Sequence, residues 1–210
     1  MPVLQWYFDV ISPYVYLQLA DLEHLPAEVA IEPKPVLFAG LLGHWGQKGP
    51  AEIPAKRIHT YRQCAWLAAE RSIPFQMPPA HPFNPLGALR LLCALGPTLQ
   101  QARIASTFVF GHGQDVSSRE GLHALGLALG VPDAEKLASQ EAAKAKLRTN
   151  TEAAVAAGIW GVPTSAIDGQ LFWGADSFPM LLNFLSDPHL FHSDEMQRHA
   201  TLPAGATRRA

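Results

Sequence analysis

The residues of this sequence that could carry chemistry begin at Ser12, which follows a β-branched and aromatic segment from Val3 to Asp9. That composition is typical of a strand, and serine followed by Pro13 is a favourable start for a helix. We therefore expect a strand to turn into a helix at Ser12. The free N–H groups and the positive end of a helix favour an anion, so an anionic ligand could bind here. The serine could equally act only as a helix cap.

Other side chains lie where they could contact a small molecule. Lys48, in a glycine-containing loop, could pair with a substrate carboxylate or could be a solvated charge. Asn84 could position a substrate or a water molecule, or cap the helix that follows it. Three aromatic residues could form the walls of a substrate pocket, although an isolated aromatic residue is usually part of the core; these are Trp45, Tyr61 and Trp173.

Cysteine and histidine spacing excludes several other chemistries. Cys64 and Cys93 form neither a CxxC motif nor a zinc-binding spacing, and we interpret them as buried free thiols in a reducing cytoplasm. The nine histidines show no HxH or HExxH spacing, so we expect no metal site. The sequence contains no GxSxG elbow and no P-loop.

The overall composition is that of a globular protein. The chain has 210 residues, of which 48% are hydrophobic and 16% charged, and its formal net charge is −2. No basic stripe indicates nucleic acid or a membrane surface, and no apolar run approaches the roughly 18 residues of a spanning helix. The first residues lack the features of a signal peptide. We interpret Arg208–Arg209 as part of a frayed terminus and expect a cytoplasmic protein.

The two ends of the chain predict the strands that would position Ser12. A second strand is expected at Val29–Phe38, which gives an opening β-α-β unit with a right-handed crossover. Near the other end, the Asp168–Gly169 turn separates Ser165–Asp168 from Gln170–Trp173 and predicts a hairpin. A last helix is expected from Ser177 to about Leu185.

The segment between these ends predicts helices. We expect them at Pro54–Arg71, Leu86–Leu95, Thr98–Phe110 and Arg119–Leu129, followed by a long alanine-rich helix from Asp133 to Ala157. The pattern therefore predicts one α/β domain, with the order β-α-β and then β-β-α, interrupted by an α-helical insertion.

Short motifs along the chain resemble a known family in their order and spacing. They are Phe8-Asp9-Val10-Ile11-Ser12-Pro13-Tyr14, Lys34-Pro35-Val36-Leu37, Gly40-Leu41, Pro54-Ala55-Lys56-Arg57, Pro74-Phe75, Phe83-Asn84, Asn150-Thr151-Glu152-Ala153-Ala154, Gly158-Ile159-Trp160-Gly161-Val162-Pro163-Thr164 and Leu171-Phe172-Trp173-Gly174-Ala175-Asp176. Together they resemble the DsbA-like branch of the thioredoxin superfamily. The resemblance is strongest to the 2-hydroxychromene-2-carboxylate isomerases and the kappa-class glutathione transferases.

The resemblance implies a fold, a cofactor and a role for Ser12. Residues 1–38 and 158–188 would form a discontinuous thioredoxin-like domain, residues 39–157 an inserted helical domain, and residues 189–210 an irregular tail. Redox members of the superfamily have CxxC at this turn, whereas Ser12–Val15 contains no cysteine. The chain's own sulfur therefore cannot exchange disulfides there. Glutathione is instead implied as a cofactor whose thiolate accepts a hydrogen bond from Ser12.

The resemblance also implies further glutathione contacts. The Val162–Pro163 bond would be cis, although only about 5–6% of X-Pro bonds are cis, and Val162 would offer its backbone to the glutathione peptide. The alternative is a trans proline that opens an edge strand. Asp176 and Ser177 could hold the γ-glutamyl end, or Asp176 could be a plain helix cap. The chain departs from the family at Ser177, where arginine is common, and in Ser106–Gly113, which lacks a usual Tyr-Trp pair.

The activity implied is glutathione-dependent isomerisation of 2-hydroxychromene-2-carboxylate, or of a related small aromatic carboxylate in aromatic-ring degradation. A kappa-like transferase that retains glutathione in its product is the first alternative. A non-catalytic thioredoxin-like module that binds a partner through the cis-proline face is the second. A disulfide oxidoreductase would require Cys64 or Cys93 to be exposed and reactive. A homodimer is possible, with Leu190–Phe191 as a candidate contact.

Overall fold

The centre of the molecule is a mixed four-stranded sheet with the strand order β2-β1-β3-β4. Strand β1 pairs in parallel with β2 and antiparallel with β3, and β3 pairs antiparallel with β4. The strands are β1 (Val3–Phe8), β2 (Ala30–Pro35), β3 (Thr164–Ile167) and β4 (Gln170–Trp173). The structure is a computed structural model and describes residues 1–206. Arg208–Arg209 lies outside the described residues.

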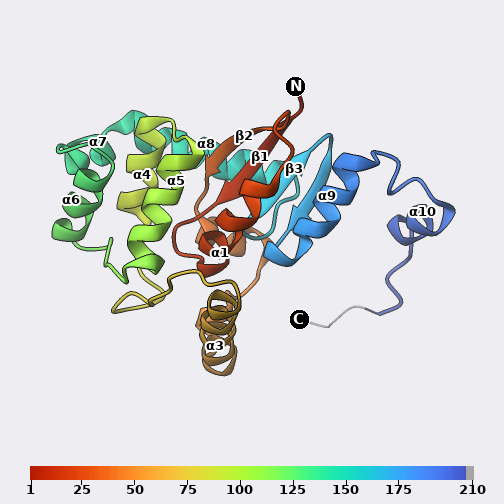
Figure 1. Cartoon of the computed structure of the whole chain (residues 1–210), viewed down its shortest axis with the longest axis horizontal. Coiled ribbons are helices and arrows are strands. Elements are labelled where there is room, and N and C mark those ends of the chain that lie inside the picture. The colour runs from red at the N-terminus through yellow and green to blue at the C-terminus, as the bar shows by residue number, and fades with distance from the viewer. Residues whose placement is uncertain (207–210) are drawn as a thin grey trace.

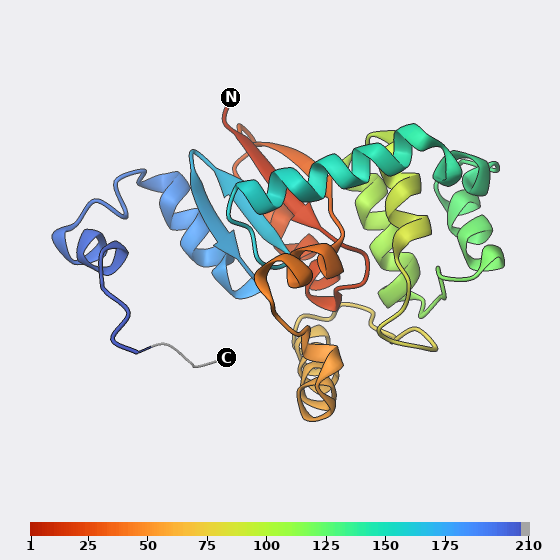
Figure 2. The ribbon, with the colours of Figure 1, turned by 180° about the vertical axis from the view of Figure 1, so that it is seen from behind.

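Helices cover both faces of this sheet. Helix α1 (Pro13–Asp21), extended by a 3-10 turn at Leu22–His24, lies on one face with α9 (Phe178–Ser186), and α8 (Glu141–Ala156) crosses the other (Figures 1 and 2). The sheet core is aromatic: Trp6 and Phe8 are fully buried, and their rings stack 4.7 Å apart. The expected β-α-β and β-β-α units are therefore confirmed.

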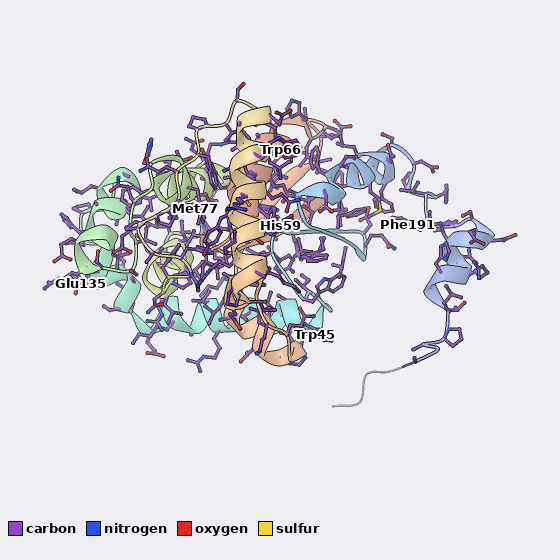
Figure 3. All side chains as sticks on the ribbon, turned by 90° about the horizontal axis from the view of Figure 1, so that it is seen from below. Trp45, His59, Trp66, Met77, Glu135 and Phe191 are labelled. Atoms are coloured by element: carbon purple, nitrogen blue, oxygen red, sulfur yellow. The ribbon has the colours of Figure 1, made fainter. Side chains whose placement is uncertain are left out.

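The middle of the chain is helical, as predicted. Its elements are α2 (Phe38–Trp45), a 3-10 turn (Pro50–Glu52), α3 (Pro54–Glu70), α4 (Leu86–Leu95), α5 (Leu99–Ser106), a π-helical turn (Thr107–Gly111), α6 (Arg119–Ala128), α7 (Ala134–Ser139) and α8. Helix α3 projects from the body, and His59 and Trp66 lie on it (Figures 1 and 3). Helix α8, from the predicted insertion, packs against strand β2 of the predicted thioredoxin-like domain. The division of the chain into two domains at residues 38 and 157 stays a prediction.

Two of the differences from the predicted element boundaries are in β2 and in the alanine-rich segment. The second strand ends at Pro35 and not at Phe38, because the N–H of Leu37 donates to Thr151 Oγ1 (3.0 Å) and that of Phe38 to Asp9 Oδ2 (2.9 Å). Helix α2 begins at Phe38. The alanine-rich segment forms two helices, α7 and α8, which are separated at Gln140. Helix α7 packs so tightly against α6 that a Cβ at Gly126 would lie 2.4 Å from the Ala134 Cβ.

The C-terminal segment contains a core contact and a short helix. The Phe191 ring packs 6.2 Å from Phe172 and 5.7 Å from Phe184, so this residue contacts the chain's own core. Beyond it, helix α10 (Asp194–Ala200) is capped by Ser193, whose hydroxyl accepts the Met196 N–H at 3.3 Å. Helix α10 lies within the tail that the sequence analysis expected to be irregular, and it stands away from the body (Figure 2). None of the helices within residues 1–206 has the length and apolar character needed to cross a membrane.

Candidate active site

Ser12 lies at the predicted strand-to-helix turn with its hydroxyl uncommitted to helix capping. It is the N-cap residue of α1, in an extended conformation (φ −93°, ψ 118°), and Pro13 follows as the first helical residue. Its side chain makes no capping hydrogen bond, and 8% of its surface is exposed. The observed geometry therefore does not support a role as a side-chain cap alone. The hydroxyl is available to a ligand at the positive end of the helix.

A cavity of about 460 Å³ opens over this turn. Four residues singled out from the sequence line it, namely Ser12, Lys48, Val162 and Trp173. The rest of the lining is mostly apolar and comes from the turn itself, α2 and the loop after it, the α3–α4 connection and the segment before β3; it includes Pro13, Tyr14, Phe38, Leu42, Pro82, Phe83, Pro85 and Trp160. An apolar cleft of this size with a few polar groups is typical of a small-molecule site.

Asp9, which the sequence analysis did not single out, is fully buried under the turn and lines the cavity. Its Oδ1 accepts the Ile11 N–H at 3.0 Å and its Oδ2 accepts the Phe38 N–H at 2.9 Å. Burial raises the pKa of Asp9 to about 7, against the opposing effect of these two hydrogen bonds. The sequence signal for Asp9 was its place directly after an apolar strand and three positions before Ser12.

His81 is a second lining residue that sequence reasoning missed. Its Nε2 lies 2.8 Å from the Ile11 carbonyl oxygen, and its Nδ1 lies 2.7 Å from the Tyr61 hydroxyl. Desolvation lowers the pKa of His81 below its ordinary value. Tyr61 was predicted as a pocket wall, but it is not among the lining residues of the cavity. Its observed contact is with His81.

The proline of the expected glutathione-binding segment is cis. The Val162–Pro163 bond is one of two cis bonds in the described residues, and the other joins His81 to Pro82. Val162 is buried and lines the cavity, whereas Pro163 does not line it and its carbonyl accepts the Gly174 N–H at 2.9 Å.

Asp176 and Ser177 lie outside the cavity lining, in a 3-10 turn that precedes α9. Helix α9 begins at Phe178, with Ser177 at the N-cap position, so the alternative in which Asp176 is the plain cap of this helix is wrong. The Ser177 hydroxyl donates to the Gly174 carbonyl at 2.9 Å. Asp176 is exposed and its carboxylate lies close to Gly174, where a Cβ would be 2.3 Å from Oδ1.

The remaining predicted residues divide between the cavity and the surrounding structure. Asn84 Oδ1 accepts the Leu86 N–H at 3.1 Å, which is the helix-capping alternative, and Asn84 does not line the cavity. Trp45 does not line it either, and its indole N–H donates to the Ile159 carbonyl at 2.9 Å. Trp173 is half exposed, and its ring lies 5.9 Å from that of Trp160.

The charge at the cavity comes from few groups. Lys48 and Glu52 lie on the loop after α2, and both are exposed. Tyr14 also lines the cavity, donates to Gln63 Oε1 at 2.7 Å, and has its pKa raised to about 12 by burial. Cys64 is buried, with a pKa also raised to about 12 by burial, so it is not a poised thiolate. Among residues 1–206, no group of three or more His, Cys, Asp or Glu side chains is placed to hold a metal ion.

A parallel β1–β2 pair, an antiparallel β3–β4 hairpin and a cis-proline directly before β3 define a thioredoxin-like α/β protein with inserted helices. The chain belongs to the family of DSBA-like thioredoxin domains, whose model matches residues 3–186. The resemblance seen in the sequence is thus confirmed.

Its relatives include kappa-class glutathione transferases and a 2-hydroxychromene-2-carboxylate isomerase. The chain is 27% identical to glutathione S-transferase kappa 2 of Caenorhabditis elegans, over 89% of this chain and 92% of that protein. It is 25% identical to the 2-hydroxychromene-2-carboxylate isomerase of Sphingobium xenophagum, over 88% of this chain and 98% of that protein. A solved 2-hydroxychromene-2-carboxylate isomerase superposes with a TM-score of 0.78, at 19% identity, over 94% of this chain and 97% of that one.

Proposed function

We propose that this protein is a glutathione-dependent isomerase of 2-hydroxychromene-2-carboxylate or of a related intermediate in aromatic degradation. The observation that carries the proposal is the Ser12 hydroxyl, which makes no capping hydrogen bond at the N-terminus of α1 and faces an apolar cavity of about 460 Å³. Relatives named as kappa glutathione transferases and as such an isomerase support the choice of cofactor and substrate class.

The residues present fit glutathione. Ser12 can donate to its sulfur, and the N-terminus of α1 favours the thiolate over the thiol. Val162, buried beside the cis bond, is the proposed backbone partner of the glutathione peptide. Asp176 and Ser177 are the proposed partners of its γ-glutamyl end, since the exposed Asp176 carboxylate lies beside the start of α9.

Bound glutathione would supply a thiolate nucleophile that adds reversibly to a conjugated carbon of the substrate, so that the former double bond can rotate before the thiolate leaves. Ser12 stabilises the sulfur by hydrogen bonding both before addition and after elimination. Lys48 attracts the substrate carboxylate. The apolar lining excludes water around the buried Ser12, which strengthens its interaction with the sulfur. Trp160 and Trp173 offer ring faces to the aromatic part of the substrate.

Asn84 and Tyr61 enter this proposal indirectly. Asn84 holds the start of α4, directly after the lining residues Pro82 and Phe83. Tyr61 contacts His81, which lines the cavity. Both side chains support the cavity wall without touching the substrate.

A kappa-like glutathione transferase is the second candidate, favoured by relatives of that name at 27% and 24% identity. It would use the same Ser12 and α1 terminus, and it differs only in keeping glutathione in the product. The proposal also includes a cytoplasmic location, where the two buried free cysteines would stay reduced, and a homodimer, which size-exclusion chromatography with light scattering would test.

Turnover of 2-hydroxychromene-2-carboxylate with catalytic glutathione, followed by mass spectrometry, tests the proposal. An isomer of unchanged mass, formed only when glutathione is present, supports the isomerase. A product that carries glutathione supports the transferase. Absence of turnover together with absence of glutathione binding overturns both proposals and favours a non-catalytic binding module.

A further inference from the structure

We propose that His81 is a positioning residue for Ser12: it fixes the peptide that leads into Ser12, and Tyr61 fixes His81 in turn. This inference rests on the proposed function, because it assigns a role in glutathione binding to two residues that do not contact the sulfur. It concerns the part of the cavity wall that comes from the α3–α4 connection.

The peptide between Ile11 and Ser12 is held at both of its polar atoms. Its carbonyl oxygen, on Ile11, accepts a hydrogen bond from His81 Nε2 at 2.8 Å. Its N–H, on Ser12, donates to the Asp9 carbonyl at 3.0 Å. Since a peptide unit is planar, these two contacts together set the orientation of the plane from which Ser12 and the first turn of α1 continue.

The partners of His81 determine its hydrogen-bonding state. A carbonyl can only accept, so Nε2 must carry a hydrogen, and in the neutral ring Nδ1 is then an acceptor. The Tyr61 hydroxyl donates to the His81 carbonyl oxygen at 2.8 Å and also lies 2.7 Å from Nδ1, so its one hydrogen, shared between these two acceptors, holds this tautomer. Desolvation of His81 lowers its pKa and favours the neutral ring.

Packing restrains the imidazole as well. Its centroid lies 5.2 Å from the Tyr61 ring at 80°, 5.9 Å from the Phe83 ring at 74°, and 6.1 Å from the Phe110 ring at 60°. Three rings from separate parts of the helical insertion thus surround one side chain that reaches across to the strand-to-helix turn. Aromatic packing alone would not require a polar atom here. The hydrogen bond from Nε2 to the Ile11 carbonyl joins the α3–α4 connection to the strand-to-helix turn.

The order of the contacts also indicates how substrate and glutathione sites are linked. Pro82 and Phe83, next in sequence to His81, line the cavity, and so do Ser12 and Ile11. A ligand that presses on Phe83 acts on the same short segment that holds the Ile11 carbonyl. His81 therefore couples the wall expected to contact the substrate to the turn expected to contact the sulfur.

Three variants of the 210-residue chain test this role, with His59→Ala as control because His59 is exposed on α3. His81→Ala removes the donor to Ile11, His81→Gln keeps an N–H near the position of Nε2, and Tyr61→Phe removes only the hydroxyl. The first readout needs no ligand: the hydrogen-exchange rate of the Ser12 amide, measured by NMR. The second readout is the affinity for glutathione, from titrations followed by ultraviolet thiolate absorbance.

We expect His81→Ala to speed Ser12 exchange and to weaken glutathione binding, each by about tenfold, since one hydrogen bond is lost. Tyr61→Phe should show a smaller change of the same sign, of about threefold. His81→Gln should restore most of the loss, and His59→Ala should match wild type. The rescue by glutamine separates positioning from simple loss of packing.

Wild-type values for both readouts in His81→Ala and in Tyr61→Phe would overturn the inference. If His81→Ala does not fold, Tyr61→Phe and His81→Gln decide: the inference requires the former to loosen Ser12 and the latter to preserve it. If wild type binds no glutathione but Ser12 exchange responds as predicted, the positioning role stands and the proposed function fails.

Discussion

The indole of Trp173 lies directly against the backbone at Gly161: a Cβ at Gly161 would be 2.4 Å from Trp173 Nε1. Both residues line the cavity, one from β4 and the other from the segment that leads to the cis-proline. The absence of a side chain at Gly161 therefore sets the place of the tryptophan in the cavity wall.

Replacing this glycine should change binding more than stability. In Gly161→Ala the methyl group must displace the Trp173 ring, which is half exposed and can move. We expect the free energy of unfolding to fall by less than about 1 kcal/mol, while the affinity for an aromatic carboxylate drops about threefold to tenfold. Gly43→Ala, where nothing lies within 4 Å of the added methyl group, is the matched control. Unchanged affinity in Gly161→Ala would show that Trp173 is not part of the binding wall.

Stability should depend on pH through Asp9. Its pKa is raised from 3.8 to about 7 in the folded protein, so between these values the folded state holds a proton that the unfolded state has lost. The free energy of unfolding contributed by this group is therefore fully present below pH 3.8 and falls as pH rises to about 7, by at most about 4 kcal/mol. Denaturant titrations across this range should show the decline in wild type and in Asp133→Asn, and not in Asp9→Asn. An equal decline in Asp9→Asn would assign it to another group.

The charge of Lys48 should matter for the substrate and not for glutathione. Lys48→Met removes the positive charge that we expect to face the substrate carboxylate, and because the lysine is exposed, the effect should be modest. We expect KM for a chromene carboxylate to rise about threefold to tenfold at constant kcat. Lys56→Met, on the exposed face of α3, should leave both constants unchanged. A fall in kcat with constant KM would instead give Lys48 a part in the chemical step.

The elements of the sheet domain were predictable because each has a strong local pattern. The aromatic and β-branched segment before Ser12 and the Asp168–Gly169 turn both predict structure without tertiary information, and the turn adopts the positive φ angles that such a pair favours (48° and 76°). The break between α7 and α8 was not predictable in this way. At the break Gln140 is extended (φ −61°, ψ 141°), although glutamine itself favours a helix.

The site was predictable only where a residue acts through its own position in the chain. Ser12 could be identified because it stands at a strand-to-helix junction. His81 acts through a carbonyl that lies 70 positions away in the sequence, and no local pattern indicates such a partner. The same holds for Asn150 and Thr151, which the resemblance marked without a role: Asn150 donates to the Pro35 carbonyl at 3.0 Å, and Thr151 accepts the Leu37 N–H at 3.0 Å. They join α8 to the end of β2.

The central claim is that Ser12 holds a glutathione thiolate. Calorimetric titration of glutathione into wild type, Ser12→Ala and the exposed control Ser139→Ala, with ultraviolet thiolate absorbance followed at neutral pH, tests it most directly. Because free thiols have a pKa of about 8.5, thiolate absorbance should rise on binding to wild type and to the control. Binding of the glutathione thiolate should be about tenfold to a hundredfold weaker with Ser12→Ala, since a hydrogen bond to a charged group is lost. Equal thiolate formation in Ser12→Ala, or no binding to wild type at millimolar glutathione, would contradict the account.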